Sequence, residues 1–208
     1  MATSPLVGVD VQLILATMSP YRREQLQSLG YSFRVVPAHI DETQHSNESA
    51  YDLTMRLAQL KAETVADLNP GCVVIGSDQV GVCDSEILTK PGNRENALAC
   101  LMRYPGSLVR FETAVCVRAP DGKIFGDVVS TTIKFREFTP GEAERYVDLD
   151  KPFDCAGAIK SERHAPLLFE SVCSDDPSAL VGLPLIKTAS FLRLLGINPL
   201  DTIDASTR

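Results

Sequence analysis

Apolar residues along this chain recur with two different periods, which predict a mixture of strands and helices. Short apolar runs bounded by turn residues predict strands at residues 11–16, 33–36, 72–75, 108–117, 124–135 and 167–172. Apolar positions three or four apart, behind capping residues or prolines, predict helices at residues 20–29, 49–68, 93–104, 139–149 and 184 or 185 to 195. The turn Ala119-Pro-Asp-Gly122 joins two long strands into a hairpin, so the pattern favours a mixed sheet over an all-parallel one.

The length and composition predict a soluble globular protein. Its 208 residues, 44% of them hydrophobic, suit one domain or two small lobes that share a sheet. The first apolar run has only six residues, at 11–16, which predicts neither a secretory nor a membrane-spanning segment. We therefore expect a cytoplasmic protein without a membrane partner, with residues 1–10 and 201–208 as flexible ends.

The cysteines and the net charge exclude two further classes. The six cysteines form no CxxC pair and only three histidines occur, which argues against a zinc site; Cys72, Cys100 and Cys116 lie in apolar runs and predict core thiols in a reducing compartment. A net charge of −7 argues against a nucleic-acid partner. An acidic protein with basic residues at particular loop ends is better matched to a small anion.

The helix start at residues 19–23 carries the first candidate chemistry. Ser19 is suited to be the N-cap and Pro20 the first helical residue. Arg22 and Arg23 then fall at the positive end of the helix dipole, at a cost of ~0.3–1 kcal/mol each. A docked anion, above all a phosphate chain, accounts for them. The alternative is two solvated arginines whose stems lie along the surface.

Other polar residues also interrupt the apolar pattern. Asp78 follows the apolar run 72–75, a position typical of a metal ligand or a general base; the alternative is a turn residue that caps its own backbone. Asp41 and Glu42 share a polar loop that can equally be a solvated one. The cations that complete this set, each with solvation as its alternative, are Lys61, Lys90 and Lys160.

Together these residues fit metal-assisted attack of water on a phosphate ester or anhydride. Carboxylates hold Mg²⁺ or Mn²⁺ through oxygen, and the metal and the cations stabilise charge on phosphoryl oxygens. No histidine or cysteine is arranged as a nucleophile, and neither the Walker A pattern nor GxSxG occurs.

Seven segments, in order, resemble the Maf-like nucleotide pyrophosphatases. They are Leu15-Ala-Thr-Met-Ser-Pro-Tyr-Arg-Arg23, Asp41-Glu42, Arg56-Leu-Ala-Gln-Leu-Lys-Ala62, Ile75-Gly-Ser-Asp-Gln-Val80, Lys90-Pro91, Cys155-Ala-Gly-Ala-Ile-Lys-Ser-Glu162 and Leu180-Val-Gly-Leu-Pro-Leu-Ile186. Each segment alone is weakly specific, whereas the ordered set is highly specific. The resemblance covers residues 11–200 and implies one domain there.

The resemblance implies a fold and an activity. The expected fold is α/β with a mixed sheet: a two-lobed domain around a long mixed β-sheet with flanking helices, similar to inosine triphosphate pyrophosphatases, with a central cleft. The family hydrolyses nucleoside triphosphates between the α and β phosphates, giving a monophosphate and pyrophosphate. It uses a divalent metal cation (Mg²⁺, Mn²⁺ or Co²⁺), and its members are commonly homodimers.

The resemblance also implies a role for each candidate residue. Asp78 is expected to be the proton acceptor and Glu42 to assist the metal or the water, so both are candidate metal ligands. Lys61 and Lys90 are expected to act with them on the triphosphate. The expected phosphate-binding residues are Thr17, Ser19, Arg22 and Lys160.

The neighbours of Asp78 favour one branch of the family. The branch for dTTP and UTP usually reads Ala-Asp-Thr, whereas Ser77-Asp78-Gln79 resembles the branch that prefers 7-methyl-GTP. In that branch the positions of Tyr21, Gln79 and Glu162 are linked to base choice. Tyr21 is suited to stack on a cationic purine, Glu162 to accept from its N1–H and amine, and Gln79 to bond another edge.

Two departures and two alternatives stay open at this point. Thr17 stands where the family usually has Ser, and Arg163-His164 where the branch has Gly, which bears on the shape of the late loop and on base preference. One alternative is a dTTP, UTP or other modified-nucleotide pyrophosphatase. The other is a non-catalytic nucleotide-binding regulator of cell division.

Overall fold

The computed structural model describes residues 12–201. Its strands are β1 (Leu13–Ala16), β2 (Arg34–Val35), β3 (Val73–Cys83), β4 (Glu86–Leu88), β5 (Leu108–Arg118), β6 (Ile124–Phe135) and β7 (Phe169–Ser174). Its α-helices are α1 (Pro20–Ser28), α2 (Ala50–Asp67), α3 (Arg94–Leu101), α4 (Pro140–Asp150) and α5 (Leu185–Leu194), with 3₁₀ turns η1 (Ala156–Ala158), η2 (Ala165–Leu168), η3 (Pro177–Val181) and η4 (Pro199–Asp201). The end expected at residues 1–10, and all of the tail except Asp201, lie outside the described residues.

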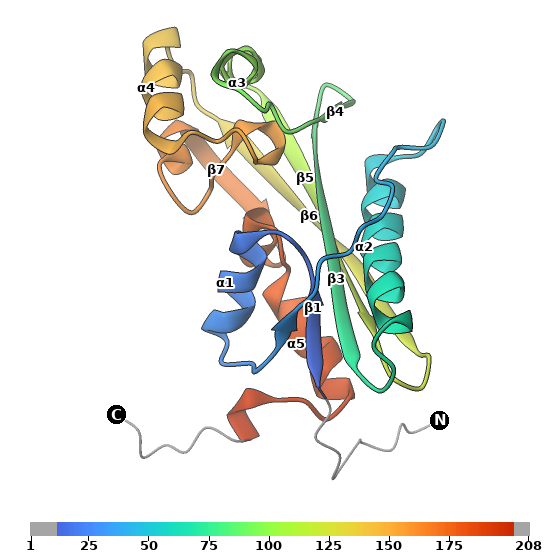
Figure 1. Ribbon diagram of the computed structural model, residues 1–208. Helices are drawn as coiled ribbons and strands as arrows, with labels where there is room; N and C mark the ends of the chain where they lie inside the picture. Colours follow the sequence, from blue (N-terminus) through green and yellow to red (C-terminus); the bar gives the residue numbers. More distant parts are fainter. Residues whose placement is uncertain (1–11, 202–208) are drawn as a thin grey trace.

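A single mixed sheet organises this part of the chain (Figure 1). Within residues 12–201 it has seven strands in the order β2-β1-β3-β5-β6-β7, with β4 paired to β3. The strands β2, β1 and β3 are parallel, and every other pairing is antiparallel. The predicted mixed sheet and the hairpin between β5 and β6 are thus confirmed.

Strand β3 is longer than the sequence predicts, which changes the setting of Asp78. The expected strand ended at residue 75, whereas β3 continues to Cys83 because β5 pairs with it as far as Val82. The parallel partner β1 ends at Ala16, opposite Gly76. Asp78 therefore lies inside a strand, two residues beyond the end of β1, and not in a turn after a strand. The cleft still opens where a parallel strand stops.

The apolar positions of α2 predict a buried stripe of leucines with Lys61 at its edge, namely Leu53, Leu57, Leu60 and Leu68. The buried face of the helix differs from that stripe. Leu53 and Leu57 are buried as expected, but Leu68 is 77% exposed. The helix instead packs through small residues, Ala58 and Ala62, closely against β3. Lys61, expected at the edge of the stripe, lies on the buried face.

Gly76 permits this close packing. A Cβ at Gly76 would collide with the carbonyl oxygen of Ala58. Glycine is therefore the residue that fits where β3 crosses α2, and the contact places Lys61 beside the strand that carries Asp78.

The predicted helix starts are confirmed. Ser19, Ser49 and Asn93 cap α1, α2 and α3 by accepting hydrogen bonds from backbone N–H groups of the first turn. Thr139 forms a capping box with Glu142 at the start of α4. Among the boundaries that differ, α3 ends at Leu101, and the last strand begins at Phe169 because residues 165–168 form η2.

Two clusters of buried side chains define the two expected lobes. The first lies under α3 and α4 and includes Leu101, Tyr104 and Phe135. The second lies between the β1 end of the sheet and helices α1 and α5, and includes Leu15 and Leu192. The long strands β5 and β6 run through both lobes, while α2 covers the other face of the sheet (Figure 1).

Two further observations on residues 12–201 concern the state of the cysteines and the lengths of the helices. All six cysteines are free; Cys116 is buried, and Cys72 and Cys100 are half-buried and pack against core clusters, in keeping with the expected core thiols. No helix in the described part of the chain is long and apolar enough to cross a membrane.

Candidate active site

The turn between β1 and α1 forms one wall of a cleft. Ser19 Oγ accepts from the Arg22 N–H at 3.4 Å, and Thr17 Oγ1 accepts from the Ser19 N–H at 3.0 Å. Both residues line the cleft, as do Tyr21 and Arg22. The predicted anion site therefore lies at the cleft, although the Thr17 and Ser19 hydroxyls already have backbone partners.

The two arginines of α1 have different surroundings. Arg22 Nε donates to the Gly182 carbonyl at 2.7 Å, which ties α1 to the loop before α5. Burial lowers the pKa of Arg22, and the charges of Asp78 and Glu42 oppose that shift. Arg23 is exposed to solvent. Arg22 is thus the arginine that faces the cleft, while Arg23 fits the solvated alternative.

A lysine held between two carboxylates forms the centre of the site. Lys61 Nζ lies 2.6 Å from Asp78 Oδ1 and 2.6 Å from Glu42 Oε1. Lys61 comes from the middle of α2, Asp78 from β3, and Glu42 from the loop between β2 and α2. Lys61 and Asp78 are buried, whereas the Glu42 side chain is 53% exposed. The structure brings together the three residues that the sequence predicted.

The charges around Glu42 keep it ionised. Partial burial alone would raise its pKa, but the Lys61 contact, with the charges of Lys90 and Arg22, holds the pKa of Glu42 below its ordinary value. Glu42 is therefore an acceptor-only group at neutral pH.

The carboxylates fit an oxygen-loving divalent cation. Glu42 and Asp78 both direct an oxygen to the point occupied by Lys61 Nζ, so a cation there would meet two carboxylates. The described residues contain no cluster of three or more His, Cys, Asp or Glu side chains that could hold a metal. Two carboxylates plus substrate phosphates are a usual ligand set for Mg²⁺, whereas a structural metal needs more protein ligands.

The cleft has a volume of about 260 Å³, and most of the predicted residues line it. Glu42, Lys61, Lys90, Gln79 and Glu162 are lining residues. Asp78 lies behind Lys61 and is not a lining residue. Its carboxylate is connected to the cleft by the ion pair with Lys61, which does line it.

Lys160 does not itself line the cleft but contacts two residues that do, Tyr21 and Asp154. Its Nζ lies 3.5 Å from Asp154 Oδ1 and 5.6 Å from the centre of the Tyr21 ring. Tyr21 OH donates to Asp154 Oδ2 at 3.2 Å. Tyr21, Asp154 and Lys160 therefore bridge α1 and the loop that follows α4.

Burial and charge shift two pKa values in this trio. Burial raises the pKa of Tyr21, against the effect of Lys160. Burial would lower the pKa of Lys160, but its contacts with Tyr21 and Asp154 raise it above the ordinary value. The phenol is thus neutral and the lysine charged at neutral pH.

The amide of Gln79 is engaged within the protein. Its Nε2 donates to Ala179 O at 2.9 Å, Leu180 O at 3.0 Å and Thr113 Oγ1 at 3.1 Å. The donor end of Gln79 thus holds η3 against the sheet. These bonds engage its amide nitrogen and not its carbonyl oxygen.

The departure at Arg163-His164 has a structural counterpart. His164 Nδ1 lies 2.5 Å from Asp150 Oδ1, and the His164 N–H donates to Asp150 Oδ2 at 2.9 Å. Asp150 is buried at the end of α4, so His164 fixes the loop to that helix. Glu162, two residues earlier, is exposed and lines the cleft.

Two contributors were missed by the sequence reasoning. Asp154 holds Tyr21, and the Gly182 carbonyl holds both Arg22 and the Ser77 hydroxyl, the latter at 2.9 Å. Asp154 directly precedes the segment 155–162, so its position next to a recognised segment was the available signal.

Comparisons with known proteins match most of the chain. The family model "Maf-like protein" matches residues 12–195. The chain is 42% identical to a protein of Albidiferax ferrireducens over 92% of this chain and 97% of that one, and 44% identical to one of Idiomarina loihiensis over 93% and 99%. Both of those proteins are named 7-methyl-GTP pyrophosphatase.

Solved structures show weaker likeness. The Ham1 protein of Staphylococcus aureus gives a TM-score of 0.49 at 12% identity, over 88% of this chain and 98% of that chain. A dITP/XTP pyrophosphatase of Mycobacterium abscessus gives 0.41 at 15% identity, over 62% and 76%. The sequence matches therefore carry the assignment: this chain belongs to the Maf-like protein family.

Proposed function

We propose that this protein is a nucleoside triphosphate pyrophosphatase that cleaves the α–β phosphoanhydride and prefers 7-methyl-GTP. One observation carries the proposal: Lys61 is shared by Glu42 and Asp78 at 2.6 Å each, near Arg22 in the first turn of α1. Relatives 42% to 44% identical to this chain are named 7-methyl-GTP pyrophosphatase, which supports both the activity and the base.

In this proposal Asp78 takes a proton from the attacking water. Water adds to a phosphorus of the anhydride, the bridging P–O bond breaks, and the monophosphate and pyrophosphate leave. Lys61 stabilises the carboxylate before the reaction and the phosphoryl oxygens during it. Arg22 and Lys90 bind the outer phosphates, and the hydroxyls of Thr17 and Ser19 lie beside them.

A divalent cation (Mg²⁺, Mn²⁺ or Co²⁺) held by Glu42 and Asp78 would neutralise charge on the bound phosphates. Lys61 must yield part of its contact with the carboxylates for this. The phosphates of the bound nucleotide would then replace the carboxylates as anionic partners of the Lys61 ammonium group.

For the base, the proposal uses Tyr21, Glu162 and Gln79. The Tyr21 ring stacks on the purine, and a cationic 7-methylguanine is favoured by the ring and by the charge of Glu162. Gln79 contributes its carbonyl oxygen. Lys160, which lies over the Tyr21 ring, moves toward the triphosphate when the base takes that place.

A nucleotide panel tests the proposal. The protein is incubated with 7-methyl-GTP, GTP, dTTP and UTP in each of Mg²⁺, Mn²⁺ and Co²⁺, and the products are identified. Pyrophosphate plus monophosphate, released fastest from 7-methyl-GTP, is the expected result. A faster reaction with dTTP or UTP would move the chain to the other branch, and binding without release would favour a regulator.

We also propose a cytoplasmic homodimer. The family resemblance supports the dimer, and six free cysteines are in keeping with a reducing compartment. Sedimentation equilibrium of the full chain, whose mass is 22.6 kDa, separates monomer from dimer.

A further inference from the structure

The loop that carries Glu42 lacks regular structure, yet it must place a carboxylate accurately. Residues 36–49 lie between β2 and α2 without helix or strand. Val36, Ala38 and Ile40 pack against buried clusters, but residues 41–47 are exposed, so little apolar burial fixes the path of the loop beyond Ile40. Its polar contacts must therefore decide where Glu42 sits.

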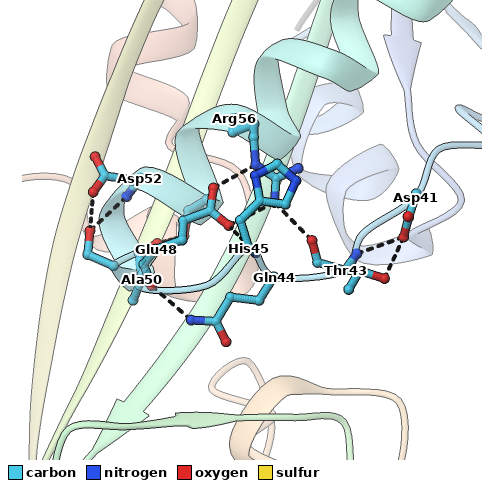
Figure 2. A network of polar contacts seen from close by, with 10 residues as sticks. Asp41, Thr43, Gln44, His45, Glu48, Ala50, Asp52 and Arg56 are labelled. Carbon is cyan, nitrogen blue, oxygen red and sulfur yellow. Dashed lines mark hydrogen bonds and ion pairs between the residues drawn. The ribbon is translucent and has the colours of Figure 1, made fainter.

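Arg56 makes the strongest of these contacts (Figure 2). Its Nε donates to Glu48 Oε1 at 2.6 Å, and one terminal nitrogen donates to Glu48 Oε2 at 2.8 Å. The same nitrogen donates to the Thr43 carbonyl at 3.0 Å. A guanidinium fork thus joins the two ends of the segment 43–48, a geometry that lysine cannot reproduce.

The loop closes around this fork through its own side chains. Glu48 Oε2 also accepts from the His45 N–H at 3.0 Å, and Gln44 Nε2 donates to the Glu48 carbonyl at 2.8 Å. Asp41 Oδ1 accepts from the Thr43 N–H at 2.9 Å. Asp41 and Thr43 are thus joined to each other by a hydrogen bond, and the backbone of Thr43 is also held by Arg56 (Figure 2). Glu42 lies between these two residues in the chain.

Helix α2 thus acts on Glu42 at two points. Lys61 binds its carboxylate, and Arg56, five positions earlier on the same helix, binds the carbonyl of the next residue. Five positions along a helix span about 7.5 Å, the scale of a short loop segment. Both the Glu42 carboxylate and the backbone next to it are therefore held by side chains of the same helix, α2.

We propose that Arg56 is a positioning residue, which places Glu42 for pyrophosphate release by holding the loop 41–48. The proposal rests on the function proposed above. Its competitor is a direct electrostatic effect, because the Arg56 charge is also felt at Asp78. The two differ in whether Arg56 matters once Glu42 is disabled.

A double-mutant cycle tests the proposal. The variants are Arg56→Ala, Glu42→Gln and the double variant, assayed for pyrophosphate release from 7-methyl-GTP. Displacement of a catalytic group by about 1 Å can cost about 10²-fold. We expect Arg56→Ala to lower kcat by about 10²-fold with KM nearly unchanged, and to cost less than about threefold in the Glu42→Gln background.

The matched control is Arg94→Ala. Arg94 makes the same two-pronged contact with Asp148, at 2.7 and 3.1 Å, between α3 and α4, and neither residue lines the cleft. Its kcat should match that of the wild type. An equal loss from Arg56→Ala in both Glu42 backgrounds, or no loss in the wild type, would overturn the positioning role.

Hydrogen exchange separates this proposal from the proposed function. The backbone amides of Thr43 and His45 are hydrogen-bonded to Asp41 and Glu48. We expect their exchange to be faster in Arg56→Ala and unchanged in Arg94→Ala, whether or not the protein is active. Absence of pyrophosphate release in the wild type would refute the function alone, and unchanged exchange in Arg56→Ala would refute the loop clamp alone.

A second variant guards against misfolding. Glu48→Gln keeps the size of the side chain and removes its charge from the Arg56 fork. We expect the same two changes, smaller than in Arg56→Ala. Wild-type kcat and wild-type exchange in this variant would overturn the proposal even if Arg56→Ala does not fold.

Discussion

The two ends of the cleft hold their side chains in different ways. At the reaction end, Lys61 and Asp78 are buried on α2 and β3 and lie 2.6 Å apart. At the base end, Tyr21 reaches Asp154 at 3.2 Å, and Lys160 reaches Asp154 at 3.5 Å. The Asp154 side chain is 58% exposed. The Lys61–Asp78 pair is therefore buried on regular elements, whereas the contacts of Asp154 at the other end are exposed to solvent.

In the proposed function the end with Lys61 and Asp78 carries out the reaction, and the end with Tyr21 selects the base. Groups on helices and strands hold a fixed geometry better than groups on loops. A phosphoanhydride is common to all nucleoside triphosphates, so the reaction end can stay the same while the base changes. In the proposed function the base end combines Tyr21 with residues of the loop after α4, and such loops tolerate substitution. Changes at the reaction end should thus affect rate, and changes at the base end should affect preference.

The largest effect is expected for Asp78→Asn at the reaction end. The amide cannot take a proton from water, so pyrophosphate release should fall by about 10²- to 10⁴-fold. Nucleotide affinity, measured by calorimetry, should remain within a few-fold because the phosphate-binding cations are intact. Asp127→Asn on β6, which removes a surface carboxylate paired with Lys187 of α5, serves as the control. Retention of a tenth of the rate by Asp78→Asn would exclude Asp78 as the base.

Lys61→Met should lower both the rate and the stability. It leaves the buried Asp78 carboxylate without its cation, and breaking a buried pair costs about 3–5 kcal/mol. Lys134→Met, which breaks an exposed pair with Glu170, should cost less than about 1 kcal/mol. Denaturant unfolding at pH 7 measures the free energy of unfolding of each variant. Equal costs would mean that the reaction end is no more rigid than the surface.

The loss of unfolding free energy caused by Lys61→Met should depend on pH. In the wild type the pKa of Glu42 is below its ordinary value of 4.5, so its contact with Lys61 adds stability above pH 4.5 and loses it as the pH falls. Lys61→Met lacks that contribution. The difference in the free energy of unfolding between the two proteins should therefore narrow below about pH 4.5.

Much of the reaction end could be predicted from the sequence, because polar residues stand out within apolar patterns. Asp78 and Lys61 each interrupt the buried face of an element, and the structure places them in contact. The end of β3 could not be predicted, since it depends on β5, which continues to pair after β1 stops. A local pattern does not contain the length of a distant partner strand.

The base end was less predictable for the same physical reason. Tyr21 and Asp154 lie 133 positions apart, and their contact depends on the path of loops without periodicity. Gln79 was assigned to the base, but its donor end holds η3, which comes about 100 positions later. Lys160 was assigned to phosphate from its segment alone, while its neighbours are Asp154 and the Tyr21 ring.

Glu162→Gln tests whether the charge of this side chain contributes to the choice of base. Removing one exposed charge near a cationic base is worth about 1 kcal/mol, so the preference for 7-methyl-GTP over GTP should fall about fivefold. The ratio of kcat/KM values for the two substrates measures it. Glu170→Gln, an exposed carboxylate of β7, should leave the ratio unchanged. An unchanged ratio in Glu162→Gln would remove Glu162 from base choice.

The smallest effect is expected for Tyr21→Phe, which keeps the ring and removes the hydrogen bond to Asp154. Because that bond is exposed and 3.2 Å long, its loss should change KM for 7-methyl-GTP by less than about threefold. Tyr21→Ala, which removes the stacking surface, should raise KM by more, about 10-fold. Initial rates over a range of substrate concentrations give both values. If Tyr21→Phe were as damaging as Tyr21→Ala, the contact with Asp154 would hold the ring as firmly as β3 holds Asp78, and the contrast between the two ends would fail.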